Sequence, residues 1–225
     1  LGQLPSTTGM YFLAPNFRSV EKTRDAETLF QYFRRYDYYL STMGKIFHGK
    51  ADKLSFDHIE PTIGWRRSNE KLRYTVPKSN PLWDWGEVDV PDEDMRDYKT
   101  AEWAAATLPD LAERTQPFFL AVGFSLPHVP IYASKKWFDL YPLEDVQLPE
   151  TTANDRDDLP EISKLLTLNP TGPRHEWMVE HNEERHAVRA YLAANSFVDY
   201  LVGMVLEGLE ASGEAENTIV VLWSD

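Results

Sequence analysis

The sequence predicts an α/β fold, a sandwich in which a central, mostly parallel sheet is flanked by helices. Segments 118–124 and 218–223 are apolar runs typical of strands buried on both faces. Segments 94–113 and 181–211 carry apolar residues at the three- and four-residue steps of amphipathic helices. Helix, buried strand, loop and helix follow one another along the chain, which is the order found in α/β sandwiches.

The composition is that of a globular domain. Of the 225 residues, 42% are hydrophobic and 26% are charged. A chain of this length is enough for one large domain and too short for two large ones. The net charge is −13, so no general affinity for nucleic acid or anionic membranes is expected. The absence of cysteine excludes disulfides and a cysteine nucleophile within these residues. No apolar run reaches the ~18 residues that cross a bilayer, so we expect no transmembrane segment in this piece.

The first predicted helix covers residues 25–35. Leu29, Phe30 and Phe33 have the spacing of one helical face. Asp25 is placed to cap the start of this helix.

A short strand is predicted over 38–43, followed by a constrained turn over 44–49. Glycines at both ends of that turn favour a conformation that presents Lys45 and His48 on the same side. The next segment, 50–94, is polar, rich in tryptophan and without a sustained period. We expect it to be a functional loop or a covering excursion, packed by its tryptophans.

The second half of the chain alternates predicted elements with long connections. The strand 118–124 runs directly into the loop 125–130, and 143–173 is a connection rich in Pro and Asp. The helix 181–211 is the clearest element, and Gly213 is placed to terminate it. The strand 218–223 should continue into a further loop, so we expect the sequence to be part of a longer protein.

Polar groups follow three of the predicted strands, where open α/β sheets place ligand-binding side chains. These residues are Lys45, His48, His128 and Asp225. A lysine and two histidines suit an anionic group, and the carboxylate could bind a hard cation such as calcium or magnesium. The alternative is a structural role for each, such as a solvated turn for Lys45 or a capping role for Asp225.

Four blocks of the sequence resemble the sulfatase family of the alkaline-phosphatase superfamily, and within it the iduronate 2-sulfatase-like branch. Their order and spacing agree with the family across nearly the whole chain. The blocks are Leu4-Pro5-Ser6-Thr7-Thr8-Gly9, Met43-Gly44-Lys45-Ile46-Phe47-His48, Pro117 to Phe124 running on to Pro127-His128-Val129-Pro130, and Asn217 to Val221 running on to Ser224-Asp225. The resemblance implies an alkaline-phosphatase-like α/β fold and hydrolysis of a sulfate ester on a sugar or similar molecule.

The resemblance also implies a role for each candidate residue. In this family, formylglycine made from a cysteine or serine attacks the sulfur, and a calcium ion balances the sulfate charge. By residue-to-residue match, Lys45 would contact the sulfate and His48 the formylglycine hydrate. His128 would bind sulfate and protonate the leaving oxygen, and Asp225 would be a calcium ligand.

The family pattern extends beyond both ends of the sequence. We expect the formylglycine precursor upstream of Leu1 and a C-terminal subdomain after Asp225, so that residues 1–225 are a partial catalytic domain without activity of its own. The resemblance further implies a formylglycine-generating or anaerobic maturating enzyme as a partner, and export to the periplasm, the lysosome or the exterior.

Two other functions remain open from the sequence. One is phosphodiester or phosphonate hydrolysis on the same scaffold, which an unmodified threonine or serine nucleophile would favour. The other is a non-catalytic homologue that binds sulfated glycans. Six basic residues could form a rim for a sulfated sugar, with ordinary surface charge as the alternative: Lys50, Lys53, Arg66, Arg67, Lys135 and Lys136.

Overall fold

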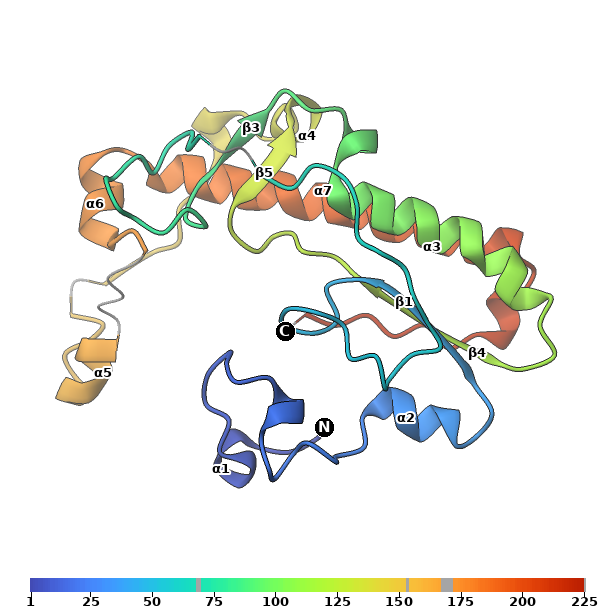
Figure 1. Cartoon of the computed structure of the whole chain (residues 1–225). Coiled ribbons are helices and arrows are strands. Elements are labelled where there is room, and N and C mark those ends of the chain that lie inside the picture. Colours follow the sequence, from blue (N-terminus) through green and yellow to red (C-terminus); the bar gives the residue numbers. More distant parts are fainter. Residues whose placement is uncertain (68–69, 153, 167–171, 225) are drawn as a thin grey trace. The chain divides into compact units, whose positions relative to one another are not determined.

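The computed structural model describes residues 1–67, 70–152, 154–166 and 172–224 (Figure 1). The strands are β1 (Tyr39–Gly44), β2 (His58–Ile59), β3 (Trp85–Val88), β4 (Phe118–Gly123) and β5 (Ile131–Ser134). The α-helices are α1 (Pro5–Thr8), α2 (Leu29–Arg34), α3 (Arg96–Ala112), α4 (Lys135–Phe138), α5 (Glu161–Leu166), α6 (His175–Glu180) and α7 (Glu184–Ala211). Short 3-10 helices are η1 (Phe17–Ser19), η2 (Asp92–Asp94), η3 (Leu143–Asp145) and η4 (Ala215–Asn217).

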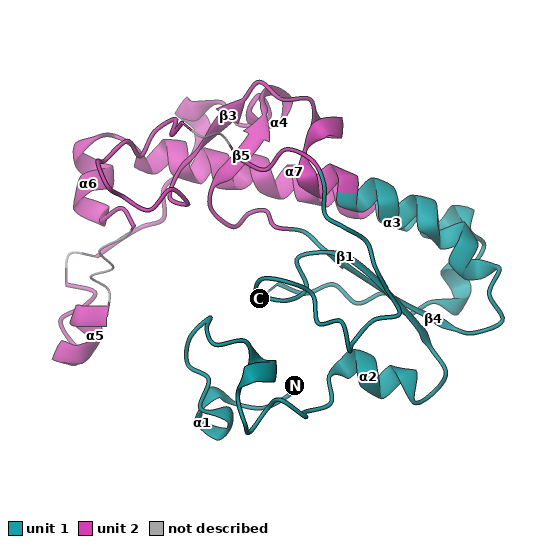
Figure 2. Cartoon of the chain, in the orientation of Figure 1, with its two compact units in different colours: residues 1–63, 100–124, 204–225 teal, residues 64–99, 125–203 magenta. Residues whose placement is uncertain are grey.

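The chain divides into two compact units, each assembled from segments that are distant in the sequence (Figure 2). Unit 1 contains residues 1–63, 100–124 and 204–225. Unit 2 contains residues 64–99 and 125–203. The two units are described separately below.

Unit 1 is built on a parallel sheet with the strand order β2-β1-β4. The register of β1 and β4 runs from Tyr39 opposite Phe118 to Gly44 opposite Gly123, so the two strands end together. Both strands lie within a residue of the predicted ranges 38–43 and 118–124, and the predicted parallel arrangement is confirmed.

Helix α2 lies in unit 1 and begins four residues later than the predicted range 25–35. Asp25 was expected to cap it, and that expectation is wrong, because Thr28 is the N-cap. The Thr28 hydroxyl accepts a hydrogen bond from the Gln31 N–H, and the Gln31 side chain accepts one from the Thr28 N–H. This reciprocal capping box satisfies two amide groups, whereas Asp25 lies too far from the first turn to reach them. Phe30 then packs from α2 onto Leu40, Phe56 and Ala121.

Unit 2 contains a second, two-stranded parallel sheet of β3 and β5 (Figure 1). The strands pair from Trp85 opposite Ile131 to Val88 opposite Ser134. The sequence did not predict either strand, because each is only four residues long and its partner is over 40 residues away. The expectation that tryptophans pack the segment 50–94 holds for Trp85, which is 2% exposed.

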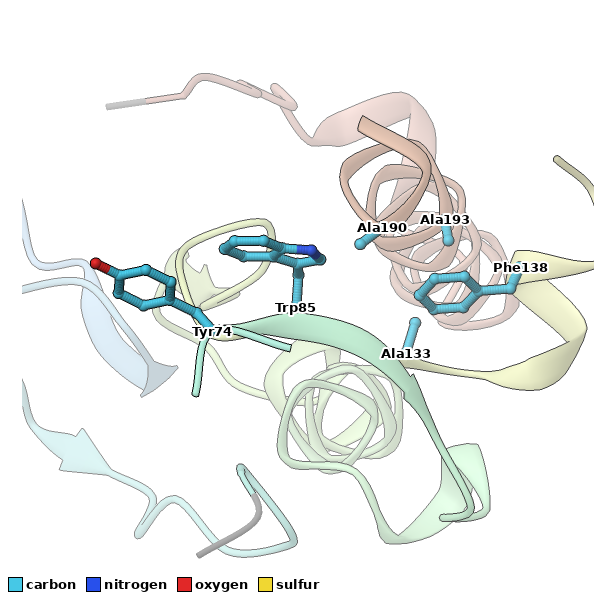
Figure 3. Packing of buried hydrophobic residues seen from close by; sticks show 6 residues of the cluster. All are labelled: Tyr74, Trp85, Ala133, Phe138, Ala190 and Ala193. Carbon is cyan, nitrogen blue, oxygen red and sulfur yellow. The ribbon is translucent and has the colours of Figure 1, made fainter. Parts of the chain in front are cut away.

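The core of unit 2 joins the sheet to helices α4 and α7 (Figure 3). Its buried members are Tyr74, Trp85, Ala133, Phe138, Ala190 and Ala193. The small side chains on α7 let the helix approach the rings of Trp85 and Phe138, and dense apolar contact of this kind stabilises the unit.

Helices α3 and α7 confirm the predicted helices 94–113 and 181–211, and Gly213 follows α7 with a positive φ of 80°. By length and composition α7 could cross a membrane, with a mean hydropathy of 1.3 over 18 residues. This is weak evidence for such a segment. Ala194, Phe197 and Leu201 on α7 are 0% exposed, so one face of this helix is buried in the folded chain. Core helices often have the same length and hydropathy as membrane-spanning helices.

The predicted strand 218–223 is wrong for the structure described here. Residues 218–224 form no strand, and no described strand pairs with them. Ile219 is 91% exposed and Trp223 is 68% exposed. An apolar β-branched run becomes a strand only where a neighbouring strand pairs with its backbone groups, and among the described residues this pairing is not formed.

The connection predicted over 143–173 is mostly irregular, as expected, but it contains η3 and helix α5. Residues 153 and 167–171 of that prediction lie outside the described part of the chain.

Candidate functional site

Two glycines bring the ends of β1 and β4 into close contact in unit 1. A Cβ added to Gly44 would lie 1.9 Å from the carbonyl oxygen of Gly123, and one added to Gly123 would lie 2.3 Å from the carbonyl oxygen of Lys45. Gly44 also has a positive φ of 91°, which disfavours other residues. The close approach allows the Lys45 N–H to donate to the Gly123 carbonyl at 2.8 Å. Lys45 is therefore held by its backbone directly at the carboxyl end of β4.

The turn that follows β1 is anchored by its apolar residues. Ile46 and Phe47 pack against the core of unit 1, and the ring of Phe47 stacks on Phe17 with centroids 5.9 Å apart. Lys45 is half-buried and His48 is exposed. Neither side chain forms a hydrogen bond or an ion pair with another described residue of unit 1. Both side chains therefore have polar groups available for a ligand.

His128 lies in the loop that follows β4 and belongs to unit 2. Its N–H donates to the Ser125 carbonyl at 3.0 Å, which closes a tight turn. Its ring Nδ1 lies 2.6 Å from the Val129 carbonyl oxygen. A carbonyl oxygen only accepts, so this contact places a proton on Nδ1 and leaves Nε2 as the ring atom that can face a ligand. The His128 side chain is exposed.

A buried carboxylate holds the start of the same loop. Asp97 is 4% exposed, and its Oδ2 accepts from the N–H groups of Ser125 at 2.9 Å and Leu126 at 2.8 Å. Burial raises the pKa of Asp97, and the two N–H donors and the charge of Arg96 act against that increase. Asp97 was not among the residues predicted from the sequence, because an aspartate in the first turn of a helix is common and no local pattern indicates bonds to residues 125 and 126.

A second buried carboxylate organises the irregular segment before β3 in unit 2. Asp84 is 0% exposed and accepts hydrogen bonds from the N–H groups of Leu72, Arg73 and Tyr74 at 2.6, 2.9 and 3.0 Å. It also accepts from the Tyr132 hydroxyl on β5. Burial and the adjacent Asp84 raise the pKa of Tyr132. With four donors around one carboxylate, Asp84 is a structural group and has no free oxygen lone pair directed at a ligand site.

The predicted site residues fall into three groups. Lys45 and His48 lie in one turn of unit 1, His128 lies in unit 2, and Asp225 lies outside the described residues. Among the residues that the structure describes, no three His, Asp or Glu side chains form a cluster that could hold a metal ion. The calcium ligand role of Asp225 therefore stays a prediction.

The six basic residues considered for a substrate rim have different surroundings. Lys135 pairs with Asp139 on α4, and Lys136 pairs with Asp92 at 2.7 Å. These two lysines have protein partners, which favours the structural interpretation for them. Trp83 and Trp85 pack in or against the core of unit 2, so the packing role expected for these rings is confirmed.

Comparison with known proteins finds one family along the whole chain. Residues 1–225 match the family model described as "Sulfatase". The chain is 36% identical over 239 residues to a protein named "Sulfatase" from Formosa agariphila, covering 100% of this chain and 47% of that protein. It is 28% identical over 253 residues to human iduronate 2-sulfatase, covering 100% of this chain and 44% of the relative.

The fold is similar to that of a solved sulfatase structure. BT1596, described as a 2-O GAG sulfatase, superposes with a TM-score of 0.57 and 19% sequence identity, over 96% of this chain and 43% of that one. This likeness shows a shared fold, of the alkaline-phosphatase-like α/β kind expected from the sequence. The chain thus spans less than half the length of each relative it matches here.

Proposed function

Because the chain belongs to the sulfatase family, we propose that the whole protein hydrolyses a sulfate ester. The observation that carries the proposal is the match of the family over all 225 residues, at 36% identity to a named sulfatase. Two structural features support the proposal. The ends of β1 and β4 fix the backbone of Lys45, and the loop after β4 leaves Nε2 of His128 available for a ligand. We further propose that residues 1–225 are a partial catalytic domain and have no activity alone.

Lys45 is proposed to bind the sulfate group. Its ammonium group carries three donors, and a half-buried setting strengthens their attraction to the sulfuryl oxygens. The backbone bond to Gly123 and the glycine contacts fix the start of the lysine side chain. A positively charged donor placed where charge develops lowers the barrier to breakage of the S–O bond.

The two histidines are proposed to handle the substrate's oxygens and the nucleophile. His128 would act as the imidazolium, in which Nδ1–H stays bonded to the Val129 carbonyl while Nε2–H binds the ester and gives its proton to the leaving oxygen. His48 would contact the formylglycine nucleophile, which is expected upstream of Leu1 in the whole protein. Residue types and their places in the family motifs support these roles.

Calcium belongs to the same proposal, with Asp225 as one ligand. A calcium ion takes about six to eight oxygen ligands, and the described residues supply no cluster of them. When bound, the ion would balance the negative charge of the sulfate. The described residues do not form this site by themselves. The roles proposed for Lys45, His48 and His128 therefore depend only on these side chains.

The proposed substrate is a sulfated sugar or a similar sulfate ester. Among the relatives of this chain, iduronate 2-sulfatase and a 2-O GAG sulfatase are named for sugar sulfates, and choline-sulfatase is named for a small sulfate ester. Conversion of the nucleophile precursor would require a formylglycine-generating or anaerobic maturating enzyme. Export of the whole protein is proposed with these relatives as support.

The proposal is tested on the whole protein, matured in cells that make formylglycine, with sulfate release from phenyl sulfate as the readout. Lys45→Ala and His128→Ala should each lower kcat/KM by about 100-fold or more, since each removes a charge-stabilising or proton-donating group. Lys22→Ala and His175→Ala change exposed residues of the same types outside the proposed site and should retain wild-type rates. Full activity in the Lys45 and His128 variants would contradict the proposed site.

A further inference from the structure

The loop that carries His128 is fastened at its start by one oxygen atom. Oδ2 of Asp97 accepts from the Ser125 and Leu126 amides at 2.9 and 2.8 Å. These amides belong to the first two residues of the tight turn, which the hydrogen bond from the His128 N–H to the Ser125 carbonyl closes. The position of the turn is therefore set from its first residue, Ser125, by Asp97. All of these residues belong to unit 2.

The free-energy cost of burying the Asp97 carboxylate indicates that its hydrogen bonds to the loop have a structural purpose. The residue is 4% exposed, and a carboxylate taken out of water is unfavourable unless donors replace the water. The favourable effect of an acid on the helix dipole of α3 does not require burial. The side chain instead reaches residues 28 and 29 positions away along the chain. Fixing the loop accounts for a buried aspartate at this position.

The attachment also controls the orientation of the imidazole. The ring's Nδ1 bonds to the next residue's carbonyl, so ring and loop backbone move together. A shift of the backbone at Ser125 would displace Nε2 by a similar amount. Misplacement of a catalytic group by about 1 Å can lower a rate by about 100-fold.

We propose that Asp97 is a positioning residue that holds the His128 loop so that Nε2 meets the leaving oxygen of the substrate. This rests on the proposed function, in which His128 is the proton donor. Asp97 does not touch the substrate and acts through the loop. Since one oxygen accepts both bonds, the role needs an acceptor and not a negative charge. An asparagine can supply that acceptor, and an alanine cannot.

Kinetics on two aryl sulfates separate this role from a general loss of stability. Phenol leaves less readily than 4-nitrophenol, so proton donation matters more for phenyl sulfate. In the whole protein, Asp97→Ala should lower kcat/KM for phenyl sulfate by about 10- to 100-fold and for 4-nitrophenyl sulfate much less. Asp97→Asn should stay within about threefold of wild type, and Asp110→Ala, an exposed aspartate on the same helix, should have no effect.

A double variant tests whether Asp97 acts through His128. If Asp97 works through His128, then Asp97→Ala should add little to His128→Ala, because the group to be positioned is gone. Equal losses on both aryl sulfates, additive losses in the double variant, or an asparagine variant as impaired as the alanine variant would each overturn the proposal.

Hydrogen exchange tests the attachment without any activity. Residues 125–130 have four amides, because Pro127 and Pro130 have none, and two of the four bond to Asp97. Asp97→Ala should speed exchange in this segment by about tenfold or more and leave β5 protected, whereas Asp97→Asn should not. If the wild-type protein releases no sulfate, the proposed function fails, while the exchange result still decides whether Asp97 holds the loop. Unchanged protection in Asp97→Ala would overturn the attachment itself.

Discussion

At the scale of single residues, the position of Lys45 depends on two glycines that have no side chain to contribute. Gly44 and Gly123 lie opposite each other at the ends of β1 and β4. Their contacts with backbone atoms leave no room for a methyl group. Backbone atoms of paired strands cannot move aside as the end of a flexible side chain can. Both glycines are therefore needed for the close approach of β1 and β4 that fixes the backbone of Lys45.

Gly123→Ala should destabilise the protein and disturb Lys45. The new Cβ would lie 2.3 to 2.7 Å from backbone atoms of Lys45, so the strands must separate, at a cost of about 3 kcal/mol. The measurement is the urea midpoint of the whole protein. Gly203→Ala is the matched control, because a Cβ there meets nothing within 4 Å and alanine favours the helix. Equal midpoints for the two variants would contradict the close-approach argument.

The sequence predicted Lys45, His48 and His128 as candidates because each lies in a short motif next to a predicted strand. The hydrogen bonds that hold these residues in place could not be predicted from the sequence. The bonds from Asp97 to Ser125 and Leu126 join residues that no local pattern connects. Buried polar groups with distant backbone partners leave no periodic signal, so such residues need a structure to be found.

At the scale of elements, an ion pair fixes the irregular N-terminal segment of unit 1. Arg18 binds the Asp52 carboxylate through two nitrogens, at 2.7 and 3.3 Å, and also donates to the carbonyls of Arg24 and Ala26. Ser55 donates to the same carboxylate at 2.7 Å. One guanidinium thus joins residues 18–26 to residues 52–55, two segments that contain neither an α-helix nor a strand.

This pair should make stability depend on pH in the acid range. Burial by itself raises the pKa of Asp52, but the hydrogen bonds from Arg18 and Ser55 outweigh it and lower the pKa below 3.8. An aspartate with a lowered folded pKa stabilises the fold above the unfolded value, and that contribution is lost as the pH falls through the folded value. The contribution should therefore be complete at pH 6 and decrease below about pH 4.

Asp52→Asn should lower the free energy of unfolding by about 1 to 3 kcal/mol at pH 6. The difference from wild type should shrink progressively below about pH 4, where the wild-type carboxylate also becomes protonated. Urea unfolding of both proteins at pH 6 and at about pH 3 measures this difference in the free energy of unfolding. Asp25→Asn removes a carboxylate from an exposed pair with Arg24 and should change stability at neither pH. A difference that is constant with pH would show that charge on Asp52 contributes nothing.

The long helices and the strands with strong apolar runs were predictable, whereas the short strands were not. α3, α7, β1 and β4 lie close to their predicted ranges. β3 and β5 form through pairing across more than 40 residues, and pairing of this kind cannot be inferred from a period. The segment 218–223 shows the opposite error, since a strand-like composition without a described partner forms no strand.

At the scale of the whole molecule, the family membership covers every part of the chain and both compact units. The net charge of −13 argues against a general polyanion binder. It does not oppose a local cationic site, because Lys45 has no ion-pair partner among the described residues of unit 1. We propose that this site acts on sulfate esters and not on phosphate esters.

Two substrates that share a leaving group distinguish hydrolysis of sulfate esters from hydrolysis of phosphate esters. The matured whole protein is given 4-nitrophenyl sulfate and bis(4-nitrophenyl) phosphate at equal concentrations, and the release of 4-nitrophenol is followed for each. The proposed function predicts a kcat/KM for the sulfate at least about 100-fold higher, because a sulfatase would stabilise the transition state of sulfate transfer more than that of phosphate transfer. Faster hydrolysis of the phosphate diester, or no hydrolysis of the sulfate, would contradict it.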